Sequence, residues 1–256
     1  MKTLFLAWQD KRPAANGGTR RWFPIGRLQA DVRAHLFHFD YTKGMKAANE
    51  VAGFRPLDAF PKLEEHYVSS ELFPLFQNRV MRKEREDFPA FVERLGLNAN
   101  EVDPFEILSV SGGERQTDTL EVFPKIEKRA DGSFMCRFFI HGWRHVNEGA
   151  RERILTLQPG EPLQVALEMN NPATGPAIQL QTVNDYYMLG WTPRYLVLDL
   201  IKSINEGPSD VKAHVVRVNP SPAPYNQRVL VELEGRFPSG IDPMTSVEFE
   251  PVLAEA

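Results

Sequence analysis

Two stretches of alternating apolar and polar residues, separated by one short loop, constrain the fold of this chain more than any other feature. Leu163, Val165 and Leu167 alternate with more polar neighbours, and Ile178 and Leu180 alternate with glutamines beyond the loop. A period of two residues is typical of strands that bury one face. The sequence therefore predicts two strands joined by an Asn-Asn-Pro loop.

The period changes at Thr192, where a helix is predicted. Thr192 can cap the helix, Pro193 suits its first position, and apolar residues then recur at helical spacing until Gly207 ends it. Two further alternating stretches, 211–215 and 229–233, predict strands joined by a proline-rich connection that cannot pair in a sheet. Short strands with one helix favour a small closed or half-open β-barrel.

The length and charge of the chain limit how it can bind partners. Its 256 residues, 42% of them hydrophobic, can form two ordinary cores, and the net charge of −4 argues against coating nucleic acid by bulk charge. A local basic patch is nevertheless present between residues 137 and 153. Its cations are Arg137, His141, Arg144, His145, Arg151 and Arg153, with Phe138, Phe139 and Trp143 among them.

Basic side chains that meet phosphates, combined with aromatic faces that stack on bases, are the chemistry of a single-stranded nucleic-acid site. The alternative interpretation is structural, because strand aromatics often belong to a core and arginines often only solvate a sheet edge. In a second structural alternative, Arg144 ties the Asn-Asn-Pro loop to the strand before it.

Cysteine content and the first residues bear on compartment. The single cysteine, Cys136, excludes an internal disulfide and a cysteine-based zinc site, and it favours a reducing setting. The apolar run within residues 1–8 is too short for a signal peptide or a membrane span. We therefore expect a cytoplasmic protein.

Catalytic and metal sites are weakly supported. His38 and Asp40 share a strand face, and Asp118, Glu121 and Lys125 are near in sequence, but neither group has the clustering that a metal site or a metal nuclease requires. The Ser-Gly-Gly-Glu stretch at 111–114 lacks the lysine of a phosphate-binding loop and is predicted to be a hairpin turn. We expect no catalysis, no cofactor and no bound metal.

The second half contains four short motifs in a fixed order and spacing: Gly142-Trp143-Arg144-His145, Asn170-Asn171-Pro172, Ala177-Ile178 and Gly190-Trp191-Thr192-Pro193-Arg194. In these motifs it resembles a HIRAN domain. The resemblance implies a small OB-like β-barrel that grips single-stranded or 3′-end-containing DNA. Where the family commonly has an aromatic residue after the arginine and a Tyr-Asp pair after Asn-Pro, this chain has His145 and Ala173-Thr174.

The residues that the patch and the resemblance together predict to bind DNA are Arg137, Trp143, Arg144, His145, Arg151, Arg153, Asn170, Asn171 and Arg194. Among them, Arg144 matches the family's DNA-gripping arginine.

The first half is predicted to form strands at 3–8 and 35–41, a short helix over 72–80 capped by Ser69-Ser70, and a helix over 87–96. It also contains Pro24-Ile25-Gly26-Arg27-Leu28, the stretch 70–79, and Asp103-Pro104-Phe105-Glu106-Ile107-Leu108 followed by Gly112-Gly113. In these stretches it resembles the N-terminal subdomain of HipA-type kinases, toxins of some bacterial toxin–antitoxin operons.

HipA-type proteins continue into a kinase domain, whereas the motifs of a kinase do not occur after residue 130. The resemblance therefore implies an antitoxin-like adaptor that docks on a separate HipA-like kinase. The apolar docking face predicted for it contains Trp22, Phe23, Phe54 and Phe60.

The sequence thus predicts an α+β protein with a mixed sheet and short helices in residues 1–125, a linker at 126–131, an OB-like barrel at 132–240 and a tail at 241–256. Two functions remain open. One is a non-enzymatic DNA-binding protein, and the other is a protein–protein regulator whose partner is a HipA-like kinase or a helicase.

Overall fold

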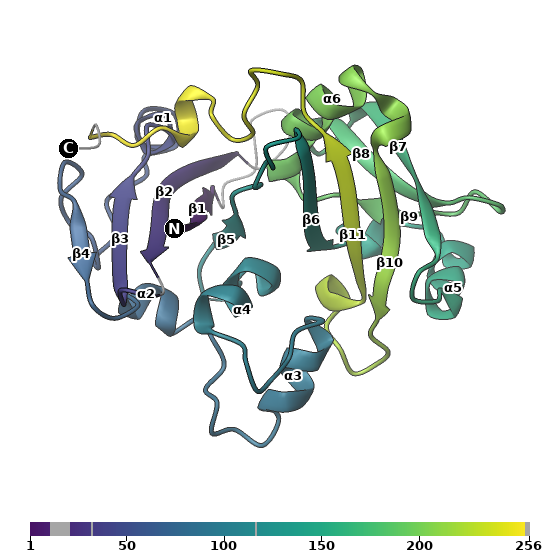
Figure 1. Ribbon diagram of the computed structural model, residues 1–256, viewed down its shortest axis with the longest axis horizontal. Coiled ribbons are helices and arrows are strands. Elements are labelled where there is room, and N and C mark those ends of the chain that lie inside the picture. Colours follow the sequence, from purple (N-terminus) through teal and green to yellow (C-terminus); the bar gives the residue numbers. More distant parts are fainter. Residues whose placement is uncertain (11–20, 32, 116, 254–256) are drawn as a thin grey trace. The chain divides into compact units, whose positions relative to one another are not determined.

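The computed structural model describes residues 1–10, 21–31, 33–115 and 117–253. The chain forms two compact units, each built on one antiparallel sheet with short helices, which confirms the predicted α+β class (Figure 1). The first unit comprises Met1–Phe88, Glu101–Lys125 and Met244–Ala256, and the second comprises Pro89–Asn100 and Ile126–Pro243.

The first unit is a five-stranded sheet in the order β4-β3-β2-β1-β5. The strands predicted at 3–8 and 35–41 are confirmed as β1 and β3, and β2 pairs with both of them. The five strands are β1 (Lys2–Gln9), β2 (Trp22–Asp31), β3 (Leu36–Tyr41), β4 (Tyr67–Ser69) and β5 (Leu120–Pro124).

The core of the first unit is aromatic. Phe39 stacks on Phe60 with ring centroids 3.8 Å apart, and Phe54 and Phe60 are both buried. The prediction that Phe54 and Phe60 belong to an exposed docking face is therefore wrong. Burial of each ring stabilises the fold by about 2–3 kcal/mol. This gain explains why both rings are in the core although they lie in proline-containing, loop-like stretches. Trp22 and Phe23, on β2, are half-buried.

The helices of this part differ in two places from expectation. The helix predicted over 72–80 is reduced to four residues, because the Ser69 hydroxyl accepts a hydrogen bond from the Glu71 N–H in a local turn instead of capping a helix. The predicted hairpin turn at 111–114 is the end of a helix, where Gly112 takes the left-handed conformation (φ 72°). The helices of the first unit are α1 (Gly44–Ala52), α2 (Pro74–Gln77), α4 (Pro104–Ser111) and η5 (Val247–Phe249), whereas α3 (Phe88–Arg94) belongs to the second unit except for its first residue.

The end of the chain is part of the first unit and not a separate tail. Thr42 and Pro251 form an isolated β-bridge, and the Phe249 ring lies 4.8 Å from that of Phe5. The Nζ of Lys43 lies 2.5 Å from a carboxylate oxygen of Glu250. The predicted tail at 241–256 therefore has to be corrected, since the segment from Met244 contributes backbone pairing and aromatic area to this unit.

The second unit is a six-stranded sheet in the order β6-β11-β10-β7-β8-β9. The alternating stretches that predicted strands are all found in it, and the Asn-Asn-Pro loop joins β7 to β8 as expected. The strands are β6 (Ser133–Phe139), β7 (Pro162–Asn171), β8 (Gly175–Thr182), β9 (Met188–Trp191), β10 (Lys212–Val218) and β11 (Val229–Arg236). The predicted linker at 126–131 belongs to this unit, because Ile126 is buried and Lys128 forms a β-bridge with Phe134.

The two outer strands of this sheet meet at one point. His141, two residues after β6, forms an isolated bridge with Trp191 at the end of β9, with N–H···O distances of 2.9 and 3.0 Å. The ladders of the described residues do not run continuously around a closed barrel. The bridge nevertheless brings the segment after β6 beside β9.

The predicted helix near Thr192 begins later than expected. Pro193 is extended (ψ 145°), so the chain first makes a 3-10 turn, and the Thr192 hydroxyl is buried without a hydrogen-bond partner among the described residues. Gly207 ends the helix as predicted. The helices are η1 (Trp143–His145), α5 (Glu148–Thr156), η2 (Arg194–Leu196), α6 (Val197–Glu206), η3 (Pro208–Asp210) and η4 (Tyr225–Gln227). In the described ranges, no helix is long and apolar enough to cross a membrane.

Candidate nucleic-acid interface

The η1 turn presents the first group of predicted site residues. Gly142, with φ of 86°, turns the chain out of the strand and into η1. A Cβ at Gly142 would lie 2.3 Å from the Trp191 ring, so only glycine lets that indole pack on the backbone. As a result, Arg144 and His145 are both exposed on the turn.

Trp143, the residue before Arg144, belongs to an aromatic and cationic cluster. Trp143 stacks on Tyr225, with ring centroids 5.9 Å apart and an interplanar angle of 21°. The Arg228 guanidinium carbon lies 5.9 Å from the Trp143 ring centroid and 5.3 Å from that of Tyr225. Tyr225 is 60% exposed, so this cluster offers an aromatic surface to solvent.

Sequence reasoning missed Tyr225 and Arg228. The proline-rich connection between β10 and β11 was interpreted only as a break in pairing, yet its η4 turn carries the tyrosine to Trp143. The one signal was an aromatic residue directly after a proline with an arginine three positions later. Such a signal is too common to identify a site by itself.

A second group of site residues surrounds the Glu168 carboxylate. One of its oxygens accepts hydrogen bonds from the Trp191 indole N–H (2.6 Å), the Gln179 amide (2.9 Å) and the Asn171 amide (3.0 Å). Burial raises the pKa of Glu168, but the hydrogen bonds from Asn171, Trp191 and Gln179 together bring the pKa below its usual value. This carboxylate is therefore ionised near neutral pH, and its hydrogen bonds link β7 to β8 and β9.

The loop after β7 holds the remaining members of this group. The Asn171 side-chain oxygen Oδ1 accepts a hydrogen bond from the Ala173 N–H at 2.9 Å, and an Arg194 guanidinium nitrogen lies 3.5 Å from the Ala173 carbonyl oxygen. Asn170 is exposed at the turn. Arg194, and not Arg144, thus lies next to the loop, which leaves the alternative of a loop-tying Arg144 without support.

Three arginines of the predicted patch are engaged elsewhere. Arg137 pairs across strands with Glu232 at 2.7 Å, and Arg153 pairs with Asp185 at 2.7 Å and also with Glu161. Arg151, on α5, donates to the Arg144 carbonyl oxygen at 3.0 Å and so supports the turn. These three arginines are therefore already held by partners within the protein. The exposed basic side chains next to the aromatic cluster in sequence are those of η1, Arg144 and His145.

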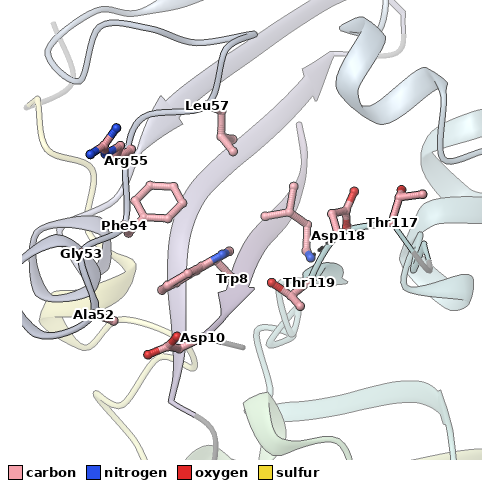
Figure 2. A pocket seen from close by; sticks show the side chains of 11 residues that line it. Trp8, Asp10, Ala52, Gly53, Phe54, Arg55, Leu57, Thr117, Asp118 and Thr119 are labelled. Atoms are coloured by element: carbon pink, nitrogen blue, oxygen red, sulfur yellow. Dashed lines mark hydrogen bonds between the residues drawn. The ribbon is translucent and has the colours of Figure 1, made fainter. Parts of the chain in front are cut away.

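The first unit contains a hollow of about 570 Å³ (Figure 2). Its apolar wall includes Trp8 and Phe54, whose ring centroids are 5.1 Å apart, and Figure 2 shows the two rings side by side. Asp10 and Asp118 add carboxylates, although that of Asp118 is paired with the buried Arg79 at 2.6 Å. Arg55 also lines the hollow, so its aromatic wall carries charged groups of both signs.

The metal alternatives find no site in the described part of the chain. No three histidine, cysteine or acidic side chains of those residues lie close enough together to hold a metal ion. Asp40 is paired with Arg27 at 3.2 Å and with His66 at 2.6 Å. Glu121 accepts a hydrogen bond from the Trp22 indole at 3.1 Å.

The Glu168 site predicts a dependence of stability on pH. Because its folded-state pKa is lowered, the ionised carboxylate stabilises the second unit above about pH 4.5, and this contribution is lost as the pH falls through the folded-state value. Glu168→Gln should cost about 1 kcal/mol near neutral pH, a modest value because the group is partly exposed. Denaturant unfolding at several pH values should show the difference from wild type shrinking in acid. A difference that is constant with pH would contradict this assignment.

Comparisons with known proteins name no family. No family model matches the chain, and no curated protein matches it. Among solved structures, a crystal structure of a protein from Lactobacillus plantarum shares 18% identity with a TM-score of 0.32, over 41% of this chain and 97% of that one. A TM-score this low does not show a shared fold.

Proposed function

We propose that this protein binds single-stranded DNA, without catalysing a reaction, through the turn η1 and the aromatic cluster of Trp143, Tyr225 and Arg228. The observation that carries the proposal is the exposed Tyr225 ring stacked on Trp143, which is followed directly by two exposed basic side chains, Arg144 and His145. Aromatic faces can stack on unpaired bases while the cations meet the phosphates between them.

The sheet of the second unit supports the proposal. A half-open, OB-like barrel is a common support for single-stranded nucleic acid, and the His141–Trp191 bridge, which joins the segment after β6 to β9, is compatible with partial closure of this kind. The resemblance of the Gly-Trp-Arg-His and Gly-Trp-Thr-Pro-Arg stretches to a HIRAN domain points the same way. Both stretches lie at this bridge.

Tyr225→Ala tests the stacking surface directly. We expect affinity for a labelled single-stranded oligonucleotide to fall roughly tenfold, since stacking of one base is worth about 1–3 kcal/mol, while Tyr225→Phe keeps most of it. Fluorescence anisotropy with the full chain measures the effect. Tyr186→Ala is the matched control, because Tyr186 is a similarly exposed tyrosine of the same unit. Equal losses for both alanine variants would overturn the placement of the site.

The same assay separates the kinds of DNA. Binding should be tighter to single strands or 3′-tailed duplexes than to blunt duplex, and log affinity should fall with log salt by about 0.7 per phosphate contact. Equal affinity for blunt duplex would exclude base stacking as the basis of binding. Binding that does not depend on salt would exclude phosphate contacts.

A further inference from the structure

The β7 strand has an open edge beyond its short contact with β10. Within the described residues the β7–β10 ladder consists of Pro162 and Leu163, whereas β7 continues to Asn171. Figure 1 shows the β7–β8 hairpin reaching away from the rest of the sheet. Among the residues that the structure describes, no strand pairs with this side of β7 from Gln164 onward.

The alternation of the backbone identifies which groups point outward. The Glu161 carbonyl accepts from Val215 at 2.9 Å, and Leu163 is bridged to Ala213, so odd-numbered residues direct their backbone groups toward the β10 side. By the same alternation, the N–H and C=O groups of Val165 and Leu167 point to this side, where the described part of the chain offers them no ladder partner. The edge stays regular up to Glu168, after which a bulge interrupts the ladder with β8.

The side chains of this edge are apolar on one face. Leu163 is buried, and the same face continues with Val165, which is half-buried, and Leu167, which is 45% exposed. Their neighbours on β8, Leu180 and Ile178, are fully buried. The apolar side chains on this face of β7 thus continue beyond the part of the strand that is buried. Such an exposed apolar edge is typical of a strand that pairs with another strand.

We propose that β7 pairs with β7 of a second copy of this chain, antiparallel and about a twofold axis at Ala166. In this register Val165 lies opposite Leu167 of the other copy, so the outward-pointing residues of both copies exchange backbone hydrogen bonds. Any register must pair odd with odd residues, and this one lies wholly within the regular edge between Leu163 and the bulge.

The side chains favour this register. Two small alanines meet at the axis, Val165 packs against Leu167, and Gln164 lies opposite Glu168, so that no like charges face each other. A register one step further would place Val165 against Met169, within the bulge. Because few residues take part, the dimer should be weak and should depend on concentration.

Disulfide trapping tests both the pairing and its register in the full chain. Residues facing each other across a non-hydrogen-bonded antiparallel pair have Cα atoms about 4.5 Å apart, which suits a disulfide, whereas residues offset by two positions are more than about 7 Å apart. With oxidised glutathione, Ala166→Cys should therefore form a covalent dimer and Leu167→Cys should not. Partial burial, with a smaller contribution from Glu232, raises the pKa of the native Cys136 thiol to about 12, so wild type should remain uncrosslinked.

Sedimentation velocity tests the interface without engineered thiols. Wild type should shift from monomer toward dimer as its concentration rises from about 10 µM to about 1 mM, and Leu167→Lys should remain monomeric because it adds a charge to the edge. Leu167→Met is the matched control and should dimerise like wild type. The thermal melt of Leu167→Lys should match wild type, since Leu167 is exposed. A wild type that stays monomeric, or a Leu167→Lys variant that dimerises normally, overturns the proposal, and cross-linking of Leu167→Cys in place of Ala166→Cys overturns the register.

Discussion

Arg144→Glu is expected to weaken binding of single-stranded DNA by about 30-fold to about 150-fold, which corresponds to about 2–3 kcal/mol. The guanidinium is exposed on η1, and it makes no ion pair with any residue that the structure describes. The substitution removes one phosphate contact and adds a repulsive charge beside the stacking surface of Trp143 and Tyr225. The slope of log affinity against log salt should fall as well.

The matched control for Arg144→Glu is Arg129→Glu. Arg129 is also exposed and belongs to the same unit, but it precedes β6 whereas Arg144 follows it, and a strand of that length separates its ends by roughly 20 Å. Both variants change the charge by the same amount, so only a local contact distinguishes them. Melting temperatures should be close to wild type for both. A folded Arg144→Glu protein with unchanged affinity and salt slope would show that the site lies elsewhere.

Local patterns were sufficient to predict most strands but not the clusters that they assemble. The alternation of Leu163, Val165 and Leu167 reports burial of one face, and β7 has that face buried at its start. The helix α5 was missed because its sequence is dominated by charged residues, which were interpreted as part of a DNA-binding patch. Apolar periodicity is the main signal of a helix, and in this stretch only Ala150 and Ile154 are buried.

Long-range pairing explains the remaining differences. The segment from Met244 joins the first unit through the bridge of Thr42 with Pro251, and a single bridge leaves no periodic trace in the sequence. Likewise, the partner of Trp143 in the stacking surface comes from the connection between two later strands. A related reason explains why the ion pairs of the predicted arginines were not anticipated: Arg137 and Arg153 pair with carboxylates on a neighbouring strand and a turn that sequence proximity does not reveal.

Gly190→Ala should destabilise the second unit by about 3 kcal/mol and abolish DNA binding at the same time. A Cβ at residue 190 would lie 2.3 Å from the His141 carbonyl oxygen, which is backbone and cannot rotate away, and φ of 142° is a conformation that glycine favours. The clash falls on the bridge between His141 and Trp191. The turn η1 follows that bridge directly, so its loss should displace Arg144 and Trp143 together.

Gly160→Ala separates this steric effect from the cost of an unusual backbone. Gly160 also has a positive φ, of 84°, but a Cβ there would meet no atom within 4 Å, so its replacement should cost only about 1 kcal/mol and leave binding intact. Denaturant unfolding and anisotropy measured on the same preparations give both quantities. If the two glycine variants lose equal stability, or if Gly190→Ala unfolds more easily yet binds DNA normally, the bridge does not hold the binding surface in place. The geometry predicts the opposite, because both backbone hydrogen bonds that join His141 to β9 among the described residues are made by Trp191, the residue next to Gly190.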